Sequence, residues 1–353
     1  MRNKFLWITV IMIFVFFGTS LTCTAADKVY KWKMQAWRSA AEPGMAYYKE
    51  IFEEVLPELT DGRLQIDMYW GGELVATPDM LDAVRSGMIE IGLASSYTYQ
   101  GEIPVAAVEY GLPFGIRSPA EKYNFMYGKE MSDIFGGWRA IDLLREEYAK
   151  RGVHLLVSGI DCWPGSFMFT SPIESIEDIE GKKVRASGLM MDWIRKLGGD
   201  GVFITGEETY SALQSGAIDG VSWGSSMGMY TTGFHEVAKH FLYPPLMPVN
   251  SANIIINKKA WDSLPDDLKI ALEQAARLAG IAHTNHQNWT GEKWGLIQME
   301  KADVEVHHLE GEDLEKAKEV AFELWDEQAE RSPASKELVG MIKDYMKTMG
   351  YLD

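Results

Sequence analysis

One short stretch carries residue types at a spacing used in nucleophilic catalysis. The sequence GSSMG at Gly224 to Gly228 fits G-x-S-x-G, the turn that exposes the serine of α/β-hydrolases, and would make Ser226 the nucleophile. A predicted strand precedes it, and Asp and His residues follow it in the chain. The sequence after Ser226 predicts no immediate helix with an apolar stripe, and no HGGG-type oxyanion stretch precedes it. A secreted serine esterase is therefore the alternative function.

A second stretch, HTNH, has a spacing found among metal ligands. It places His283 and His286 three residues apart on a predicted helix. Zinc requires further ligands, so we interpret these histidines as part of a solvated helix face. The histidines suggest no other catalytic role.

Strands and short helices alternate in both halves of the chain and must position any site. Strand and helix patterns follow one another in the first half at 28–37, 43–62, 63–72, 77–87 and 89–96. The second half repeats the order at 152–159, 182–188, 188–199, 201–204, 206–216 and 217–224. This order indicates an α/β fold with a largely parallel sheet in each half.

One phrase occurs in both halves. LDAVRSGMIEIGLASS at 81–96 and YSALQSGAIDGVSWGSS at 210–226 align with identical Ala, Ser, Gly and Ile residues. In open α/β sheets, ligands bind beyond the carboxyl ends of strands. Two such lobes facing each other would place Ser95 and Trp223 on opposite walls of a cleft. Any α/β sheet also produces helix–Gly–strand phrases, so spacing alone leaves both interpretations open.

The N-terminus indicates export. Arg2 and Lys4 precede the apolar run Phe5 to Phe17, and small and polar residues follow up to Ala26. This run is shorter than the roughly 20 residues that span a bilayer. Residues 1–26 therefore resemble a cleaved signal peptide of a periplasmic protein. Cys23 raises lipidation as an alternative, although SLTC is a poor lipobox.

The net charge argues against nucleic acid and anionic lipid as partners. The chain carries a net charge of −17, which becomes two units more negative if Arg2 and Lys4 leave with the signal peptide. Such a surface repels nucleic acid and anionic lipid.

Several motifs resemble one transport family. The stretches that carry the resemblance are GGELVATPDMLDAVRSGMIEIGLASSY, YGLPF, SPIESIEDIEGKKVRASG, ETYSALQSGAIDGVSWG and IIINKKAWDSLPDDLKIALEQAA. In this order they are similar to the DctP-type solute-binding subunit of tripartite ATP-independent periplasmic (TRAP) transporters. The resemblance implies a protein without enzymatic activity that delivers a small organic acid to a sodium-driven membrane permease.

The resemblance also implies an architecture. The expected fold is a type II-like periplasmic binding protein with two α/β lobes, mixed sheets and a long helix bracing both lobes. Lobe 1 should comprise residues 27–159 and about 251–290, and lobe 2 residues 160–250 and about 291–353. Val320, Ala321 and Leu324 could form a dimer stripe, but packing on their own lobes is favoured, so we expect a monomer or weak dimer.

The resemblance assigns the anion to Arg185 in KKVRASG. A planar guanidinium independently matches a carboxylate or sulfonate through two parallel hydrogen bonds. The loop DCWPGSFMFTS places Phe167 where relatives that bind acidic sugars carry a second arginine, which argues against such a sugar. Relatives that bind keto acids through a metal carry carboxylates at positions matching SWGSS and LMPVN, and none occurs here. No metal and no other cofactor are expected.

Aromatic residues complete the expected site. Rings give flat, rigid, partly apolar walls for a small ligand. A chain with 12 Trp buries most of them, so Trp223, which lies in the site segment of the family, is the best supported. The candidates besides Arg185 are Trp223, Phe167, Trp163, Trp37, Ser95, Tyr97 and Asn250, which could donate an amide or serve a turn. The sequence leaves the identity of the acid open.

Overall fold

The computed structural model describes residues 28–42, 44–128 and 138–352. The expected signal peptide at 1–26, with Cys23, lies outside these ranges. The described chain forms a nine-stranded mixed sheet in the order β2-β1-β3-β8-β4-β7-β5-β6, with β9 paired to β8. The strands are β1 (Tyr30–Ala36), β2 (Leu64–Tyr69), β3 (Ile91–Ser95), β4 (Val153–Phe169), β5 (Lys183–Arg185), β6 (Asp200–Val202), β7 (Gly220–Trp223), β8 (His240–Asn257) and β9 (Glu305–His308).

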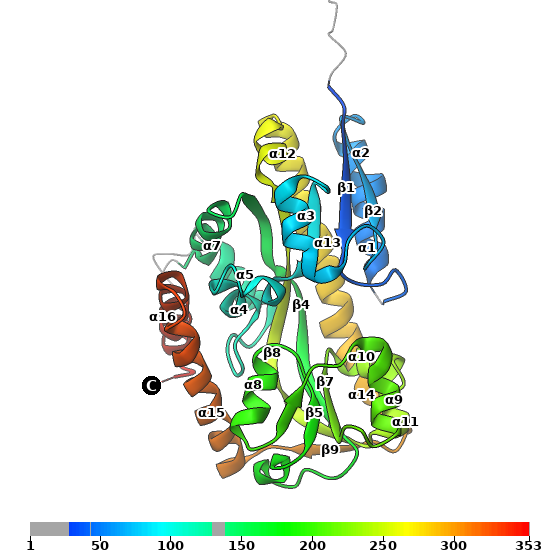
Figure 1. Cartoon of the computed structure of the whole chain (residues 1–353), viewed down its shortest axis with the longest axis vertical. Coiled ribbons are helices and arrows are strands. Elements are labelled where there is room, and N and C mark those ends of the chain that lie inside the picture. The colour runs from blue at the N-terminus through cyan, green and yellow to red at the C-terminus, as the bar shows by residue number, and fades with distance from the viewer. Residues whose placement is uncertain (1–27, 43, 129–137, 353) are drawn as a thin grey trace, which may run out of the picture.

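The strand order is symmetric about the pair β4–β8. On one side, β1 pairs in parallel with β2 and β3, and β3 pairs antiparallel with β8. On the other side, β5 pairs in parallel with β6 and β7, and β7 pairs antiparallel with β4. We call the half with β1 to β3 lobe 1 and the half with β5 to β7 lobe 2. The two lobes lie at opposite ends of the long axis (Figure 1).

The repeated phrase occupies the same place in both lobes. Helix α3 (Met80–Ser86) leads through Gly87 to β3, and α9 (Gly206–Gln214) leads through Gly216 to β7. Gly87 and Gly216 have φ angles of +80° and +71°, a conformation that glycine adopts without the steric penalty of a Cβ. The recurrence is therefore confirmed as two equivalent helix–strand units.

Strands β4 and β8 join the lobes. They are 17 and 18 residues long and pair antiparallel, with irregular register between Leu155 and Phe167. The expectation that DCWPGSFMFTS forms a loop is wrong, because β4 continues through it to Phe169. Proline and glycine in this stretch signal a break locally. Pairing with β8 and, from Ser166 onward, with β7 keeps the stretch extended.

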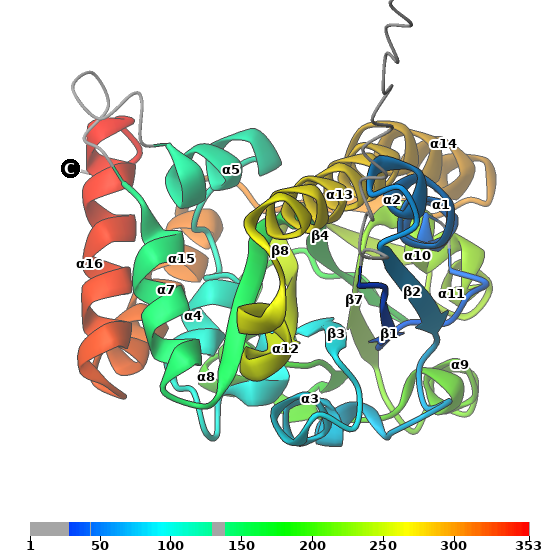
Figure 2. The same cartoon turned by 90° about the horizontal axis from the view of Figure 1, so that it is seen from above.

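Helices cover the sheet in both lobes (Figures 1 and 2). Lobe 1 buries a core of Trp32, Met34, Phe52, Ile66 and Leu93, and lobe 2 buries Met168, Val221, Phe234 and Phe241. The lobe 1 helices are α1 (Met45–Glu50), a π-helical turn (Ile51–Val55), α2 (Leu56–Leu59), α3, α4 (Val105–Tyr110), α5 (Pro119–Tyr127), α7 (Ala140–Ala149) and α12 (Lys258–Ser263). The lobe 2 helices are α8 (Leu189–Lys196), α9, α10 (Ser226–Thr231) and α11 (Phe234–Val237).

A long, nearly continuous helical segment contacts both lobes. It consists of α13 (Asp266–Asn285), a π-helical turn (His286–Gly291) and α14 (Glu292–Lys301). Helix α13 packs on β4, and α14 packs on α10. A Cβ added at Gly280 would lie 2.9 Å from Ile160, and one added at Gly295 would lie 2.2 Å from the backbone nitrogen of Met227. Both glycines therefore permit a close approach, and the expected bracing helix is present.

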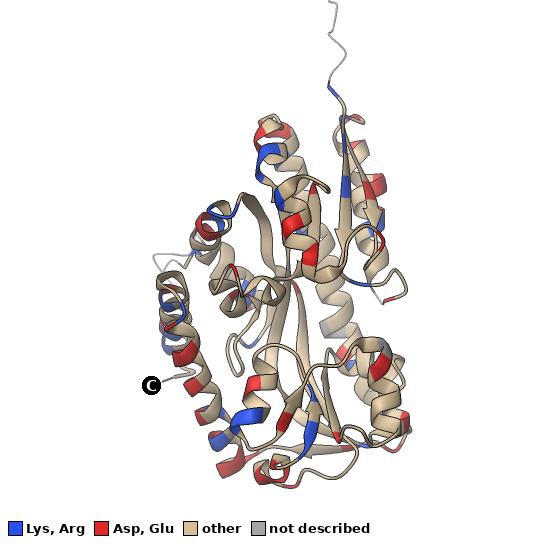
Figure 3. Ribbon diagram, in the orientation of Figure 1, with Lys and Arg blue, Asp and Glu red and all other residues tan. Residues whose placement is uncertain are grey.

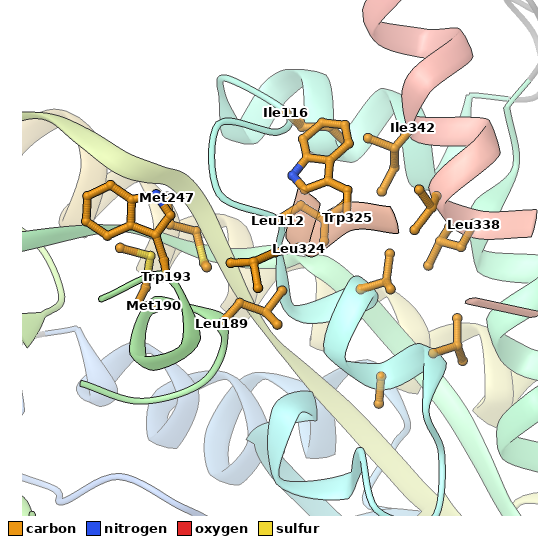
Figure 4. Close-up of a cluster of buried hydrophobic side chains, with 14 of the residues drawn as sticks. Leu112, Ile116, Leu189, Met190, Trp193, Met247, Leu324, Trp325, Leu338 and Ile342 are labelled. Atoms are coloured by element: carbon orange, nitrogen blue, oxygen red, sulfur yellow. The ribbon is translucent and has the colours of Figure 1, made fainter. Parts of the chain in front are cut away.

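The C-terminal helices pack across the molecule. Helix α15 (Gly311–Ala329) contacts α8 of lobe 2 and α4 of lobe 1, and α16 (Pro333–Thr348) contacts α4 and α7 of lobe 1. Figure 4 shows Trp193, Leu324, Trp325 and Leu338 in the cluster that joins them. The C-terminal helices therefore contact both lobes, and the assignment of 291–353 to lobe 2 stays a prediction. Ala321 and Leu324 are buried in this cluster, as the favoured interpretation of their stripe predicted.

Acidic residues are spread over helices of both lobes (Figure 3). Within the described residues, no helix combines the length and apolarity needed to cross a bilayer.

Candidate functional site

Arg185 ends strand β5 and is held rigidly. Its side chain is only 8% exposed. Nε donates to the carbonyl oxygen of Ile204 at 3.1 Å, and Nη1 donates to that of Ser222 at 2.9 Å. Burial lowers the pKa of Arg185 to about 10, so the group stays charged at neutral pH. Among the side chains that the structure describes, none forms a salt bridge with this guanidinium. The backbone bonds fix its orientation without neutralising it.

Trp223 lies beside Arg185 in lobe 2. The guanidinium carbon of Arg185 is 4.5 Å from the centroid of the Trp223 ring and 5.9 Å from that of Phe203. Trp223 ends β7, the strand that pairs in parallel with β5. The two side chains therefore stand together at the carboxyl ends of neighbouring parallel strands, where α/β sheets bind ligands.

Lobe 1 and the crossing strand β4 contribute a chain of aromatic contacts. The Tyr97 ring lies 6.0 Å from Tyr110, Tyr110 lies 6.1 Å from Trp163, and Trp163 lies 6.0 Å from Trp37, measured between centroids. Tyr97 lies in the 3-10 helix Ser96–Tyr99, directly after Ser95 at the end of β3. The structure thus brings Trp37, Tyr97 and Trp163 together, with Ser95 two residues before Tyr97.

Arg38 adds a second cation that the sequence analysis did not identify. Its guanidinium carbon lies 4.6 Å from the Trp37 centroid and 4.3 Å from the Trp163 centroid. Nη1 is 3.4 Å from Oε2 of Glu42. Nε and Nη2 are buried and find no acceptor among the described residues. A buried N–H without an acceptor is costly, so this edge of Arg38 is suited to an acceptor from outside the chain.

Asn250 lies on β8 opposite Trp163. The two residues are register partners in the β4–β8 pair. The Oδ1 atom of Asn250 and the Nε1 atom of Trp37 are buried, and neither has a hydrogen-bond partner in the described chain. The region therefore offers one acceptor and one donor in addition to the edge of Arg38.

Two glycines of lobe 2 connect these groups. A Cβ at Gly188 would lie 3.3 Å from the Tyr97 ring, and a Cβ at Gly224, next to Trp223, would lie 3.6 Å from the Trp163 ring. We call the assembly the interlobe cluster. It consists of Trp37, Arg38, Tyr97, Tyr110, Trp163, Arg185, Trp223 and Asn250.

The charges of Arg38 and Arg185 both affect the pKa of Tyr110. Burial raises the pKa of Tyr110 to about 12, and the positive charges of Arg38 and Arg185 oppose that shift. Both guanidinium groups therefore act on the same phenol, although one belongs to lobe 1 and the other to lobe 2. Their combined field favours an anion between them.

Phe167 does not join the cluster. Its side chain is 0% exposed and packs 5.9 Å from Phe169 and 5.8 Å from Trp193, between ring centroids. The expectation that Phe167 lies in a loop at the site is wrong. Because β4 continues through this stretch, the side chain instead points into the core beneath α8.

Ser226 is not arranged as a nucleophile. Its hydroxyl donates to the carbonyl oxygen of Glu292 at 2.7 Å, its N–H donates to Oε2 of Glu292 at 2.8 Å, and the residue is fully buried. Ser226 is the first residue of the short helix α10, which Ser225 caps by accepting from the N–H of Gly228. The G-x-S-x-G match is therefore a capped helix start, and the esterase alternative is not supported.

His283 lies in the interior, so the expectation of a solvated helix face is wrong for it. Nδ1 of His283 lies 2.6 Å from Oδ1 of Asp161, and Tyr48 donates to Oδ2 of Asp161 at 2.7 Å. Burial alone would raise the pKa of Asp161, but His283, Arg38 and Tyr48 hold it below its usual value. This buried network ties α13 to β4 where that strand passes between the lobes.

Two residues of the interlobe cluster, Arg38 and Tyr110, are not among the site residues expected from the sequence. Arg38 directly follows Trp37, and a basic residue after a predicted strand was an available signal. Tyr110 lies in YGLPF, a stretch used for the resemblance but not for the site. Its proximity to Trp163 depends on how α4 packs against β4.

Comparisons with known proteins agree on one family of bacterial solute-binding proteins. The family described as "Bacterial extracellular solute-binding protein, family 7" matches residues 36–332. The monocarboxylate 2-oxoacid-binding periplasmic protein of Nostoc sp. is 27% identical over 320 residues, which cover 90% of this chain and 84% of that protein. The C4-dicarboxylate-binding periplasmic protein DctP of Rhodobacter capsulatus is 26% identical, covering 83% of this chain and 84% of that protein.

Solved structures share the fold. A TRAP periplasmic solute-binding protein from Colwellia psychrerythraea, with bound calcium and pyruvate, has a TM-score of 0.78 at 23% identity. The alignment covers 92% of this chain and 96% of that chain. At this identity the likeness supports the two-lobed fold and not a particular ligand.

Proposed function

Because the chain belongs to family 7 of the bacterial extracellular solute-binding proteins, the solute-binding subunits of TRAP transporters, we propose that it captures a small organic acid in the interlobe cluster. The acid carries a carboxylate or a short sulfonate. Members of this family bind and deliver substrates, so we infer no enzymatic activity for the chain.

This proposal rests on the burial, charge and hydrogen bonds of Arg185. It is buried, charged, oriented by Ile204 and Ser222, and without a salt bridge to any described carboxylate. A buried charge needs a partner to offset its desolvation. A carboxylate or sulfonate from the ligand supplies that partner, with geometry that the planar guanidinium favours.

The second arginine narrows the ligand class. Arg38 presents Nε and Nη2 without acceptors, Trp37 presents Nε1, and Asn250 presents Oδ1. Glu42 lies near Arg38 and offsets part of its charge. We therefore propose a ligand with its acid group on Arg185 and a second polar group, such as a carbonyl, hydroxyl or further carboxylate, towards Arg38. The aromatic rings enclose the short carbon skeleton between them.

Hinge closure would complete the site. Within the described residues, β4, β8 and the helical segment from α13 to α14 run between the two sheet halves. Across the lobes, a Cβ at Gly188 would contact the Tyr97 ring, and one at Gly224 would contact the Trp163 ring. A ligand that contacts Arg185 in lobe 2 and Arg38 in lobe 1 would favour the closed arrangement by its differential affinity.

The remaining proposals concern place and partners. Curated relatives are periplasmic binding proteins, and we propose the same location for this chain after cleavage near Ala26. We further propose delivery to TRAP membrane subunits, no nucleic-acid partner, and a monomer or weak dimer.

A ligand screen tests this function. Purified mature protein is mixed with single 2-oxo acids, dicarboxylates, pyroglutamate and short sulfonates, and the melting temperature is measured. A ligand that binds only the folded state raises it by mass action. Calorimetry on the best ligand then compares wild type with Arg185→Met and with Arg195→Met, whose side chain is 52% exposed.

We expect Arg185→Met to lose about 2 to 5 kcal/mol of binding free energy, and Arg195→Met to bind like wild type. Circular dichroism checks that both variants are folded. Unchanged affinity in folded Arg185→Met would overturn the assignment of Arg185. Turnover of nitrophenyl esters by wild type would instead point to an enzyme.

A further inference from the structure

A second group of side chains lies far from the interlobe cluster, where β9 pairs in parallel with β8. His240 of β8 is the register partner of Glu305 of β9, and His307 follows two residues later on β9. Successive side chains alternate between the faces of a strand, so Glu305 and His307 share a face. The register places His240 beside them on that face, and His308 on the opposite face.

The ligand atoms of these three residues converge. Nδ1 of His240 lies 2.9 Å from Nε2 of His307 and 3.4 Å from Oε2 of Glu305, and Nε2 of His307 lies 3.7 Å from the same oxygen. Zinc binds nitrogen and carboxylate oxygen at about 2.0–2.2 Å, so two ligand atoms of a tetrahedral site lie about 3.3 Å apart. The three observed separations scatter around that value.

We propose that His240, Glu305 and His307 bind a divalent transition-metal cation of the Zn²⁺ class. Two imidazole nitrogens and one carboxylate oxygen suit such a cation, whereas Ca²⁺ and Mg²⁺ require mainly oxygen ligands. The fourth position is taken by water, because the Glu305 side chain is 69% exposed. This is the one group of three His, Cys, Asp or Glu ligand atoms in mutual reach within the described residues.

The position suggests what the cation does. Strand β9 pairs with β8 alone and leads directly into α15, the helix that packs on α8. A cation shared by β8 and β9 would fasten this edge strand in addition to its backbone hydrogen bonds. The site is structural and separate from the organic-acid site, so it does not depend on the proposed function.

The test uses the mature chain without a histidine tag, treated with chelator and dialysed. Zinc chloride is titrated into wild type, His240→Ala, His307→Ala, Glu305→Gln and His308→Ala, and calorimetry and melting temperature are recorded. We expect one zinc ion per wild-type chain and a melting temperature that rises with zinc. We expect at least tenfold weaker binding in His240→Ala and His307→Ala, weaker binding in Glu305→Gln, and unchanged binding in His308→Ala.

Three results would overturn the proposal. The first is no zinc binding by wild type, and the second is equal zinc affinity in wild type, His240→Ala and His307→Ala. The third is an equal loss in His308→Ala, which would indicate surface histidines acting without a defined geometry. Glu305→Gln keeps the shape of the side chain, so it remains informative if an alanine variant fails to fold. Calcium chloride, as the parallel titrant, should give no heat at this site.

Discussion

The guanidinium carbon of Arg38 lies 4.3 Å from the centroid of the Trp163 ring, so a cation two residues beyond the end of β1 lies on an aromatic residue of the strand that crosses between the lobes. Nε and Nη2 of Arg38 have no hydrogen-bond acceptor within the described chain. The stacking therefore fixes the orientation of these two donors but leaves them available to a ligand.

Arg38→Met should therefore weaken binding of the acid found in the screen by about 1.5 to 3 kcal/mol, the usual value of hydrogen bonds to a charged group. Arg117→Met is the matched control, because Arg117 lies 3.6 Å from the centroid of the Tyr351 ring and belongs to no part of the cluster. Calorimetry gives both affinities. Equal affinities of the two variants would remove Arg38 from the site.

Ligand binding should not require a divalent metal. Two arginines already supply positive charge to the cluster, and a cation beside them would be repelled. The structure does bring one carboxylate to the segment after Trp223, since Glu292 accepts from the Ser226 N–H at 2.8 Å. Burial raises the pKa of Glu292, which disfavours its charged form.

Chelator-treated protein should accordingly bind the acid with the same affinity with and without calcium. The comparison matters because the relative from Colwellia psychrerythraea holds calcium with pyruvate. Binding that disappears after chelation and returns with calcium would contradict the expectation. In that case Glu42 and Glu292 are the carboxylates to replace next.

Ser226→Ala should affect stability rather than chemistry. The substitution removes the donor to the Glu292 carbonyl, a buried contact between α10 and α14. Its expected cost is about 1 kcal/mol of unfolding free energy, with ligand affinity within about tenfold of wild type. Urea unfolding measures the first quantity and calorimetry the second. Ser215→Ala, which removes an exposed hydroxyl, should cost less; an esterase activity lost only in Ser226→Ala would restore the hydrolase alternative.

The close approach of α14 to α10 should make Gly295 intolerant of a side chain. A Cβ there would lie 2.2 Å from the Met227 nitrogen and 2.4 Å from the Ser226 carbonyl carbon. We expect Gly295→Ala to cost about 1 to 3 kcal/mol of unfolding free energy through overpacking. Gly340→Ala is the control, because nothing lies within 4 Å of a Cβ at that position of α16. The free energy of unfolding of Gly340→Ala should rise by up to about 1 kcal/mol, because alanine has a higher helix propensity than glycine. Equal stability of the two variants would contradict the close packing at Gly295.

Local pattern in the sequence was sufficient for much of the fold. Alternating polarity marked β1 and β2, and the phrase around Gly87 and Gly216 marked two equivalent units. These patterns involve residues within about one helix or strand of each other, so they can be recognised without knowledge of the rest of the chain. Local pattern also predicted a strand in KKVRASG, whereas the choice of Arg185 as a site residue came from the family resemblance.

Tertiary structure alone decided where the crossing strand ends and which side chains meet. Phe167 entered the core because β8 and β7 pair with β4 across a stretch whose own residues indicate a loop. Arg38 reached Trp163, and His240 reached His307, across 125 and 67 positions of chain. Such contacts depend on strand register and helix packing between distant segments, and no local propensity specifies them. The sequence thus indicated the two lobes and, through the family resemblance, Arg185 as the candidate anion-binding residue, whereas the side chains around Arg185 follow only from the folded chain.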